Sequence, residues 1–363
     1  MGCGTSCDNF ARSEFDCMLS NYKSNRAAGN AAFARHWQTW ITPDTVQSVH
    51  DVGLNAIRIP IGYWSYVDIV DKASEPFADP GPMLAALDAV IQKCTDLGMY
   101  VIMDLHGAPG GQQEDAFTGQ VNVPAGFFNV YNFGCAQKWM GWMARRIHTT
   151  PSYRAAVGMI EVLNEPVSEH DNHDDYRRYP APGQVPGLTE AYYPAALRAV
   201  RDVESSLGIS PDQQLHVVFM DKKWLGGDPR ATAAVRNDAL VAFDDHNYIG
   251  LDDAKGPVLM ERTCTDHRQE AGEDFKVVGE WSLRSGGVNW TDSASREFFT
   301  KWFTAQQQMY EEPGMAGWVF WTWKTELNDP TWTYSHLTAL NWIPTDAAGL
   351  QQNVYQDVCQ PWR

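Results

Sequence analysis

Short apolar runs alternate regularly along the chain with longer stretches of helical periodicity. Apolar runs of this length, rich in β-branched residues, are typical of strands buried on both faces of a parallel sheet. The predicted strands are Leu54–Pro60, Met99–Leu105, Gly158–Leu163, Leu215–Met220, Leu240–Phe243, Phe275–Gly279 and Gly317–Trp321. The predicted helices are Pro43–Val52 (capped by Thr42), Pro82–Leu97, Ala136–His148, Ala191–Leu207 and Ser293–Tyr310.

This alternation indicates either a βα barrel or a doubly wound sheet. A doubly wound nucleotide-binding fold needs a Gly-x-Gly-x-x-Gly turn after its first strand, and none follows Leu54–Pro60. A nucleotide-dependent oxidoreductase is therefore a weak alternative. No repeat, low-complexity tract or linker interrupts the pattern, so we expect one catalytic domain over residues 1–363, a (β/α)₈ TIM barrel.

Polar or aromatic side chains follow almost every predicted strand at its C-terminal end. In a (β/α)₈ barrel these ends converge on one mouth, where active sites lie. Packing alone does not explain polar groups at the same end of so many strands. The residues concerned are Arg58, Asp104, His106, Asn164, Glu165, Asp221, His246, Tyr248, Glu280, Trp321 and Trp323.

Two carboxylates stand out by context, because Glu165 follows a buried run in VLNEP and Glu280 ends another in VVGEW. A carboxyl group beside apolar residues loses solvation, which raises its pKa toward the range useful for proton transfer. A retaining glycosidase needs one such acid and one ionised carboxylate nucleophile, about 5–5.5 Å apart. One Glu at a strand end is equally well explained by a surface salt bridge. Two of them, with the polar groups above, favour glycoside hydrolysis.

The charge balance narrows the classes of partner. A formal net charge of −17 argues against nucleic acid and anionic membranes, since both attract basic proteins. No run of about 18 apolar residues is present, so no membrane-spanning segment is predicted. The 15 Trp residues suit stacking against sugar rings, although most Trp side chains in any protein fill the core. A neutral polysaccharide is compatible with these properties.

In their order along the chain, the strand-end residues resemble glycoside hydrolase family 5, whose pattern is Arg, His, Asn-Glu, His-x-Tyr, Glu and Trp. The matching fragments are IRIP, DLHGAPG, LNEP, DHNY, VGEW and FWTWK, and they extend from residue 58 to residue 323. Each fragment alone is a weak signal, but the full set in family order is specific. Within the family, DLHGAPG, FWTWKTE, SEFDC and the AFTGQ loop are most similar to fungal endo-β-1,6-glucanases.

The resemblance implies a role for each matching residue. Glu165 is the expected acid/base, and Glu280 is the expected nucleophile, oriented by Arg58 and Tyr248. The enzyme is expected to act on β-glucan as a monomer, without metal or cofactor. The expected substrate-binding residues are Asn164 at the 2-hydroxyl, His106 and His246 at hydroxyls or the catalytic carboxyls, Trp321 beneath the sugar ring, and Trp323 and Phe117 as further aromatic contacts.

Two alternatives stay open. The related exo-β-1,3-glucanases usually follow HGAPG with a loop of the type NGFDNSG, where this chain has GQQEDAFTGQ, and carry a second clamp aromatic where this chain has Leu251. Both departures weaken, without excluding, an exo-β-1,3-glucanase or a disaccharide-releasing β-glycosidase. The non-enzyme alternative is an inactive glucan-binding barrel, and the presence of both glutamates argues against it.

Two further groups of residues have less bearing on function. The polar stretch Ser168–Pro186 contains His170 and His173 among aspartates, but such a mixture on a loop is usually solvated, so no metal site is predicted. The 7 cysteines show no paired zinc spacing, and their odd number leaves at least one free thiol. Cys94, at apolar spacing on a helix, is expected to be that buried free thiol.

The resemblance also sets expectations for the rest of the chain. It implies a disulfide between Cys264 and Cys359, and a first barrel strand of the type RGVNLGGW that no run before residue 54 provides. The segment Cys3–Ile41 is expected to form loop and short helix, which would leave seven strands, an open gap in the barrel and low stability. No signal peptide is visible. The expectation of secretion therefore rests on the resemblance, the cysteines and the sequon at Asn289.

Overall fold

The structure is a computed structural model that describes residues 13–121, 125–166, 187–224, 226–268 and 275–362. Across these ranges the strands are Ala56–Gly62 (β1), Tyr100–Gly107 (β2), Val157–Glu161 (β3), His216–Met220 (β4), Val241–His246 (β5), Lys276–Glu280 (β6) and Met315–Trp318 (β7). The helices are Glu14–Ser20 (α1), Arg26–Thr39 (α2), Pro43–Asp51 (α3), Gly81–Leu97 (α4), Val130–Thr149 (α5), Pro151–Ala156 (α6), Tyr193–Leu207 (α7), Ala233–Arg236 (α8), Gly256–Thr265 (α9), Arg296–Tyr310 (α10), Tyr334–Ala339 (α11) and Ala347–Val354 (α12).

The predicted alternation of strands and helices is confirmed. Each predicted strand overlaps one observed strand, with ends that differ by a few residues, and each predicted helix overlaps an observed helix. The predicted cap is also present, since the Thr45 N–H donates to the Thr42 hydroxyl oxygen over 3.3 Å. Within the described ranges, no helix combines the length and the apolar character needed to cross a bilayer.

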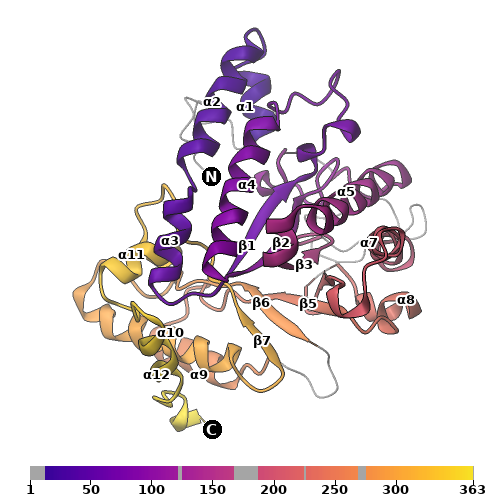
Figure 1. Cartoon of the computed structure of the whole chain (residues 1–363). Coiled ribbons are helices and arrows are strands. Elements are labelled where there is room, and N and C mark those ends of the chain that lie inside the picture. Colours follow the sequence, from indigo (N-terminus) through magenta and orange to yellow (C-terminus); the bar gives the residue numbers. More distant parts are fainter. Residues whose placement is uncertain (1–12, 122–124, 167–186, 225, 269–274, 363) are drawn as a thin grey trace. The chain divides into compact units, whose positions relative to one another are not determined.

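The chain divides into two compact units, and the first comprises Met1–Val46 and Ile57–Val241. Its strands follow the order β1-β2-β3-β4, with β2–β3 and β3–β4 parallel. Inner positions such as Val101, Met103 and Leu105 are fully buried, as expected of strands covered on both faces. Helices α5 and α7 pack against each other in this unit (Figure 1). The carboxyl ends of β1, β2 and β3 carry the polar residues considered below.

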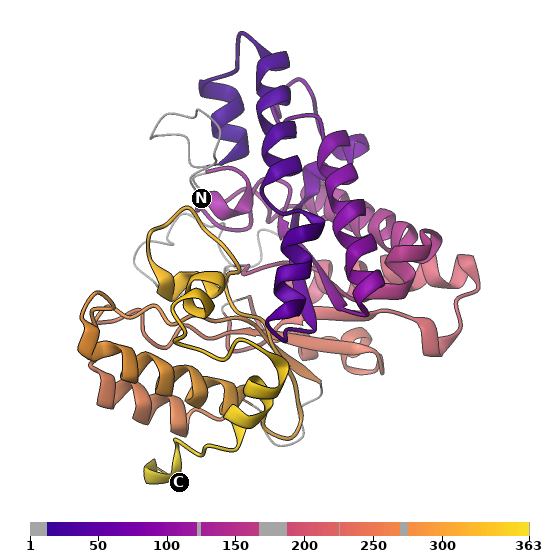
Figure 2. The same cartoon turned by 60° about the vertical axis from the view of Figure 1, so that its left-hand side comes forward.

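The N-terminal segment is more helical than predicted. Helices α1 and α2 lie side by side (Figure 2) and share a small core of Cys17, Met18, Phe33 and Ala78. Helix α2 has 14 residues and begins after Asn25, whose side-chain oxygen accepts from the Ala28 N–H. Its composition of Ala and Asn gives almost no apolar periodicity, which explains why the sequence did not predict it. Residues 1–12 lie outside the described ranges, so the expected absence of a first barrel strand stays a prediction.

The second unit comprises Gln47–Ala56 and Ala242–Arg363. Its strands follow the order β5-β6-β7, with both pairs parallel, and α9 and α10 pack together as the two long orange helices of Figure 2. The core is unusually aromatic. Trp281 is fully buried and meets the rings of Tyr310, Trp318 and Phe320 edge-on at 5.0–5.3 Å. This core lies directly behind the carboxyl end of β6, where Glu280 is found.

The predicted disulfide between Cys264 and Cys359 is confirmed. It ties the last residues of the chain to α9, and both cysteines are almost completely buried. Cys17 is also disulfide-bonded, whereas Cys94 and Cys135 are free and buried. Burial raises the pKa of the Cys94 thiol to about 12, so this thiol stays protonated and unreactive at neutral pH.

Removing the Cys264–Cys359 cross-link should lower the free energy of unfolding by about 4 kcal/mol, since it closes a loop of 95 residues. The double variant C264S/C359S avoids leaving one unpaired thiol, and C94S serves as a control that breaks no cross-link. Denaturant unfolding of the three proteins measures the difference. Equal unfolding midpoints for the wild type and the double variant would show that the bond contributes nothing.

Candidate active site

In the first unit, the Arg58 guanidinium is the centre of a buried polar group. Its Nε donates to Glu161 Oε2 over 2.8 Å, and its Nη2 donates to Asn164 Oδ1 over 2.8 Å. The same Nη2 lies 3.1 Å from Asp104 Oδ2. The side chains of Asp104 and Glu161 are fully buried, and that of Arg58 is 2% exposed. Arg58 therefore fixes the amide of Asn164, the residue that precedes Glu165.

Asp104 and Glu161 explain why an arginine is needed at this position. They are register partners on β2 and β3, so two carboxylates lie next to each other in a buried sheet. Like charges at this distance destabilise the sheet unless a cation lies between them. The guanidinium of Arg58 is that cation. Glu161 was not among the predicted site residues, although a charged residue inside the apolar run GMIEVL indicates a buried ion pair.

His106 lies near the end of β2 and belongs to the same buried polar group as Arg58. It contacts Asp104 on β2 and Phe117 in the loop that follows. Its Nδ1 lies 2.8 Å from Asp104 Oδ2, which fixes the orientation of the ring. Phe117 meets the imidazole edge-on with ring centroids 5.6 Å apart. The predicted sugar-contact residues His106 and Phe117 are thus brought together, and a carboxylate orients the histidine.

Trp64 and Glu14 support the loop that follows β2. The Trp64 indole N–H donates to Glu14 Oε2 over 3.0 Å, and its ring stacks on Phe77 with centroids 4.3 Å apart. A Cβ atom at Gly107 or Gly119 would collide with the Trp64 ring, so only glycine fits at both positions. Burial raises the pKa of Glu14 to about 7. The SEFDC motif therefore has a structural purpose, because its glutamate holds this tryptophan.

Glu165 follows β3 in an unusual backbone conformation. Its φ is +38°, in the left-handed region, although it is not a glycine and precedes Pro166. A non-glycine residue in this region costs on the order of 1–3 kcal/mol and persists only where its surroundings enforce it. Upstream, the Asn164 N–H donates to the Leu105 carbonyl over 3.0 Å, which ties the segment to β2. Such strain is common at functional sites.

In the second unit, the predicted residues Tyr248, His246 and Glu280 come together. The Tyr248 hydroxyl donates to Glu280 Oε2 over 2.7 Å. His246 is fully buried between two carboxylates, with Nδ1 3.6 Å from Glu280 Oε2 and Nε2 3.6 Å from Asp244 Oδ2. The backbone of Glu280 is fixed as well, since its carbonyl accepts from the Asn247 N–H over 2.9 Å. The carboxylate of Glu280 is therefore oriented by a phenol and an imidazole.

Gly279 is required by the packing of Asp244 against the strand that ends in Glu280. The Gly279 N–H donates to Asp244 Oδ1 over 2.7 Å. A Cβ atom at position 279 would lie 2.1–2.5 Å from the Asp244 carboxyl atoms, a distance that no side chain tolerates. The glycine of the VGEW motif thus lets a buried aspartate approach the backbone directly before Glu280. Asp244 was not among the predicted site residues.

Trp321 and Trp323 follow β7 and have different surroundings. The Trp321 N–H donates to the Trp281 carbonyl over 2.7 Å, and its side chain is half-buried. Trp323 packs on the aromatic core, stacked on Tyr334 with ring centroids 6.0 Å apart. The ring of Tyr248 lies 5.6 Å from that of Trp332. Trp332 is a further aromatic beside the site residues, which the sequence did not single out.

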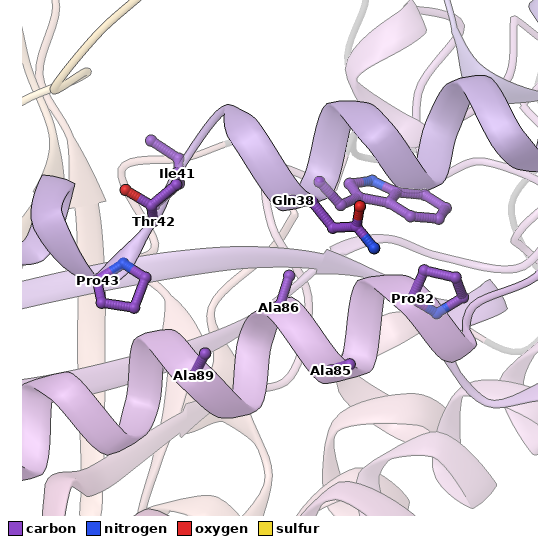
Figure 3. A pocket seen from close by; sticks show the side chains of 9 residues that line it. Gln38, Ile41, Thr42, Pro43, Pro82, Ala85, Ala86 and Ala89 are labelled. Atoms are coloured by element: carbon purple, nitrogen blue, oxygen red, sulfur yellow. The ribbon is translucent and has the colours of Figure 1, made fainter.

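A separate hollow of about 240 Å³ lies in the first unit between α2 and α4. In Figure 3, Gln38 on α2 faces Pro82 on α4, and Ala85, Ala86 and Ala89 form a row of small side chains along α4. None of its lining residues carries a charge. Since the described residues that line it include no carboxyl, imidazole, amine or thiol group, the hollow is no candidate for the chemistry. The predicted polar loop Ser168–Pro186 lies outside the described residues.

Residues 20–326 match the family described as Cellulase (glycosyl hydrolase family 5). The chain belongs to glycosyl hydrolase family 5. The match confirms the family that the strand-end residues predicted. The protein is therefore a glycoside hydrolase. Family 5 is a retaining family, so two carboxyl groups are required for its chemistry.

Named relatives and solved structures refine this assignment. A glucan endo-1,6-beta-glucosidase B of Emericella nidulans is 38% identical over 92% of this chain and 78% of its own length. A probable glucan 1,3-beta-glucosidase A of Aspergillus fumigatus is 29% identical over 87% of this chain and 77% of its own length. The crystal structure of rutinosidase from Aspergillus niger superimposes with a TM-score of 0.70 at 18% identity, covering 92% of this chain and 90% of that chain. The last likeness shows a shared fold.

Proposed function

We propose that this family 5 enzyme is an endo-β-1,6-glucanase, a single catalytic domain that cleaves β-1,6-glucan with retention. The observation that carries the linkage is the 38% identity to a glucan endo-1,6-beta-glucosidase, against 29% to the 1,3-beta-glucosidase relative. The loop GQQEDAFTGQ and the exposed Leu251 also differ from what the exo-β-1,3 enzymes usually carry. An exo-β-1,3-glucanase is the second candidate.

In the first step, the Glu280 carboxylate attacks the anomeric carbon of the sugar. The bond from that carbon to the glycosidic oxygen breaks, and Glu165 donates its proton to the departing oxygen. The product is a glycosyl ester on Glu280 with inverted configuration. The hydrogen bond from Tyr248 to Glu280 Oε2 supports this role, because it holds one carboxylate oxygen and orients the other for attack.

In the second step, Glu165, now ionised, removes a proton from water, and the water oxygen attacks the same carbon. The ester bond to Glu280 breaks, and the second inversion restores the β configuration. Asn164 is proposed to bind the 2-hydroxyl. Arg58 supports that role by holding Asn164 Oδ1, which directs the amide nitrogen away from the guanidinium. The action of Arg58 on Glu280 stays a prediction.

Digestion of pustulan (β-1,6-glucan) against laminarin (β-1,3-glucan) tests the proposed specificity. We expect the enzyme to release a ladder of short β-1,6-linked oligosaccharides from pustulan and little reducing sugar from laminarin. Glucose as the first and main product from laminarin would favour the exo-β-1,3-glucanase instead. No hydrolysis of either polymer would favour an inactive glucan-binding barrel.

Replacing Tyr248 with Phe should lower kcat/KM on pustulan about 10- to 100-fold, the effect of one hydrogen bond to a charged group. The ring beside Trp332 stays in place, so the thermal unfolding midpoint should fall only slightly, by the contribution of one lost hydrogen bond. Steady-state kinetics and a melting curve on the same preparation give both values. Loss of the folded state at the assay temperature together with loss of activity would assign Tyr248 a packing role only.

We extend the proposal to a monomeric enzyme that acts outside the cell. Buried disulfides such as Cys264–Cys359 are typical of proteins from oxidising compartments. Asn289 of the sequon is exposed, which a glycan requires. An enzyme outside the cell would reach the β-glucan of fungal cell walls. Deglycosylation of the protein from its native host, followed by mass spectrometry, checks for a glycan at Asn289.

A further inference from the structure

Two adjacent glutamines hold the backbone on either side of Glu165. The Gln113 side-chain amide donates to the Glu165 carbonyl over 2.6 Å. The Gln112 side-chain amide donates to the Asn164 carbonyl over 2.8 Å. These carbonyls belong to the two peptide groups that flank the Glu165 Cα. Because φ and ψ of Glu165 are the rotations of those two groups about its Cα, holding both carbonyls sets both angles.

Gln112 is itself fixed by the loop that follows β2. Its amide nitrogen also donates to the His106 carbonyl over 2.7 Å, and its side-chain oxygen accepts from the Ala108 N–H over 3.0 Å. The side chain is fully buried. Both amide hydrogens and the oxygen are therefore used, and a shorter or apolar side chain would leave buried polar groups unpaired. Gln112 couples the backbone of His106 to that of Asn164.

The conformation that these glutamines hold is one that Glu165 would not adopt unaided. Its φ of +38° is disfavoured for any residue with a side chain, and the following proline restricts it further. Released from its two hydrogen bonds, the backbone would relax toward negative φ, and the carboxyl group would swing away from its present direction. General acid catalysis depends on that direction, since the proton must reach the glycosidic oxygen.

We propose that Gln112 and Gln113 are positioning residues, which hold Glu165 in a strained backbone conformation and so aim its carboxyl group at the glycosidic oxygen. This inference rests on the proposed role of Glu165 as acid/base. Neither glutamine needs to touch the sugar. Their effect acts through the backbone of the residue that donates the proton.

The test is the dependence of kcat/KM on the leaving group in Gln113→Met, which keeps the side-chain length and removes the hydrogen bond. The substrates are pustulan and aryl β-gentiobiosides whose phenols differ in acidity. A misaimed acid slows only reactions that need a proton on the leaving oxygen. We expect kcat/KM to fall about 10- to 100-fold on pustulan and the phenyl glycoside, and less than about 3-fold on the 2,4-dinitrophenyl glycoside.

Two further variants make the result decisive. Gln92→Met changes an exposed glutamine on α4 and should leave every rate unchanged. Gln112→Met should show the same leaving-group pattern as Gln113→Met if it folds, and Gln113→Met carries the test if it does not. An equal fall across all substrates, or no fall on any, overturns the proposal. Glu165→Gln, measured on the same substrates, tests the acid/base role separately from the role of the glutamines. If its kcat/KM falls equally on all substrates, Glu165 is not the acid/base.

Discussion

The variant Glu280→Ala should hydrolyse pustulan at least about 10⁴-fold more slowly than the wild type, because no covalent intermediate can form without the nucleophile. On an activated aryl gentiobioside, added azide should restore part of the rate. The azide ion fits in the space of the lost carboxylate and attacks from the same side. The expected product is therefore the α-glycosyl azide, formed by a single inversion and identified by proton NMR.

The matched control for this experiment is Tyr248→Phe, which removes one hydrogen bond to Glu280 and keeps the carboxylate. It should show no rescue by azide, since its nucleophile is intact. Residual hydrolysis by Glu280→Ala with retained configuration and no azide product would remove Glu280 from the nucleophile role. Loss of the folded state in Glu280→Ala would be detected by its melting curve.

The variant Glu165→Gln should lose about 10²- to 10⁴-fold in kcat/KM on pustulan, the usual contribution of a general acid. On a substrate with a good leaving group, the loss should be small, and the basic limb of the pH profile should vanish. That limb arises in this account because Glu165 must be protonated before attack. The glycosyl ester on Glu280 still forms, so azide should now give the β-glycosyl azide by two inversions.

The two azide products have opposite anomeric configurations, so NMR of the products distinguishes the roles of the two carboxyl groups. An α product from Glu280→Ala and a β product from Glu165→Gln assign each residue to its step. An unchanged basic limb in Glu165→Gln would mean that another group is the acid. His106 would then be the first residue to substitute, because a buried carboxylate orients it.

The sequence predicted the strands well because each is a short apolar run with polar residues on both sides. The boundaries shifted where a strand continues into its polar end, as in β5, which extends to His246. Helix α2 was missed because its fourteen residues bury only Gly29 and Phe33, so no apolar stripe marks it. The short helices α6, α8, α11 and α12 offer too few residues for a periodic signal.

The candidate site was predicted where residues carry a motif and was missed where they act through partners distant in sequence. Glu161 lies inside an apolar run, and the register of β2 and β3 shows that it meets Asp104. Asp244 follows an apolar run, and its hydrogen bond from the Gly279 N–H joins residues on two neighbouring strands. Gln112 and Gln113 bind backbone carbonyls some fifty residues away, a relation that no local pattern encodes. The sequence did not predict that Arg58 binds Asp104, Glu161 and Asn164, and its expected action on Glu280 stays a prediction.

The most direct test of a retaining mechanism with Glu280 as nucleophile is to trap the covalent intermediate. A 2-deoxy-2-fluoro-β-gentiobiosyl fluoride forms the glycosyl ester quickly and releases it slowly, because the fluorine at C2 destabilises both transition states and the good leaving group speeds only the first step. We predict a mass increase of one fluorinated disaccharide, located by peptide mapping on Glu280. A label on Glu165 or on any other residue, or turnover without a labelled enzyme, would contradict the account.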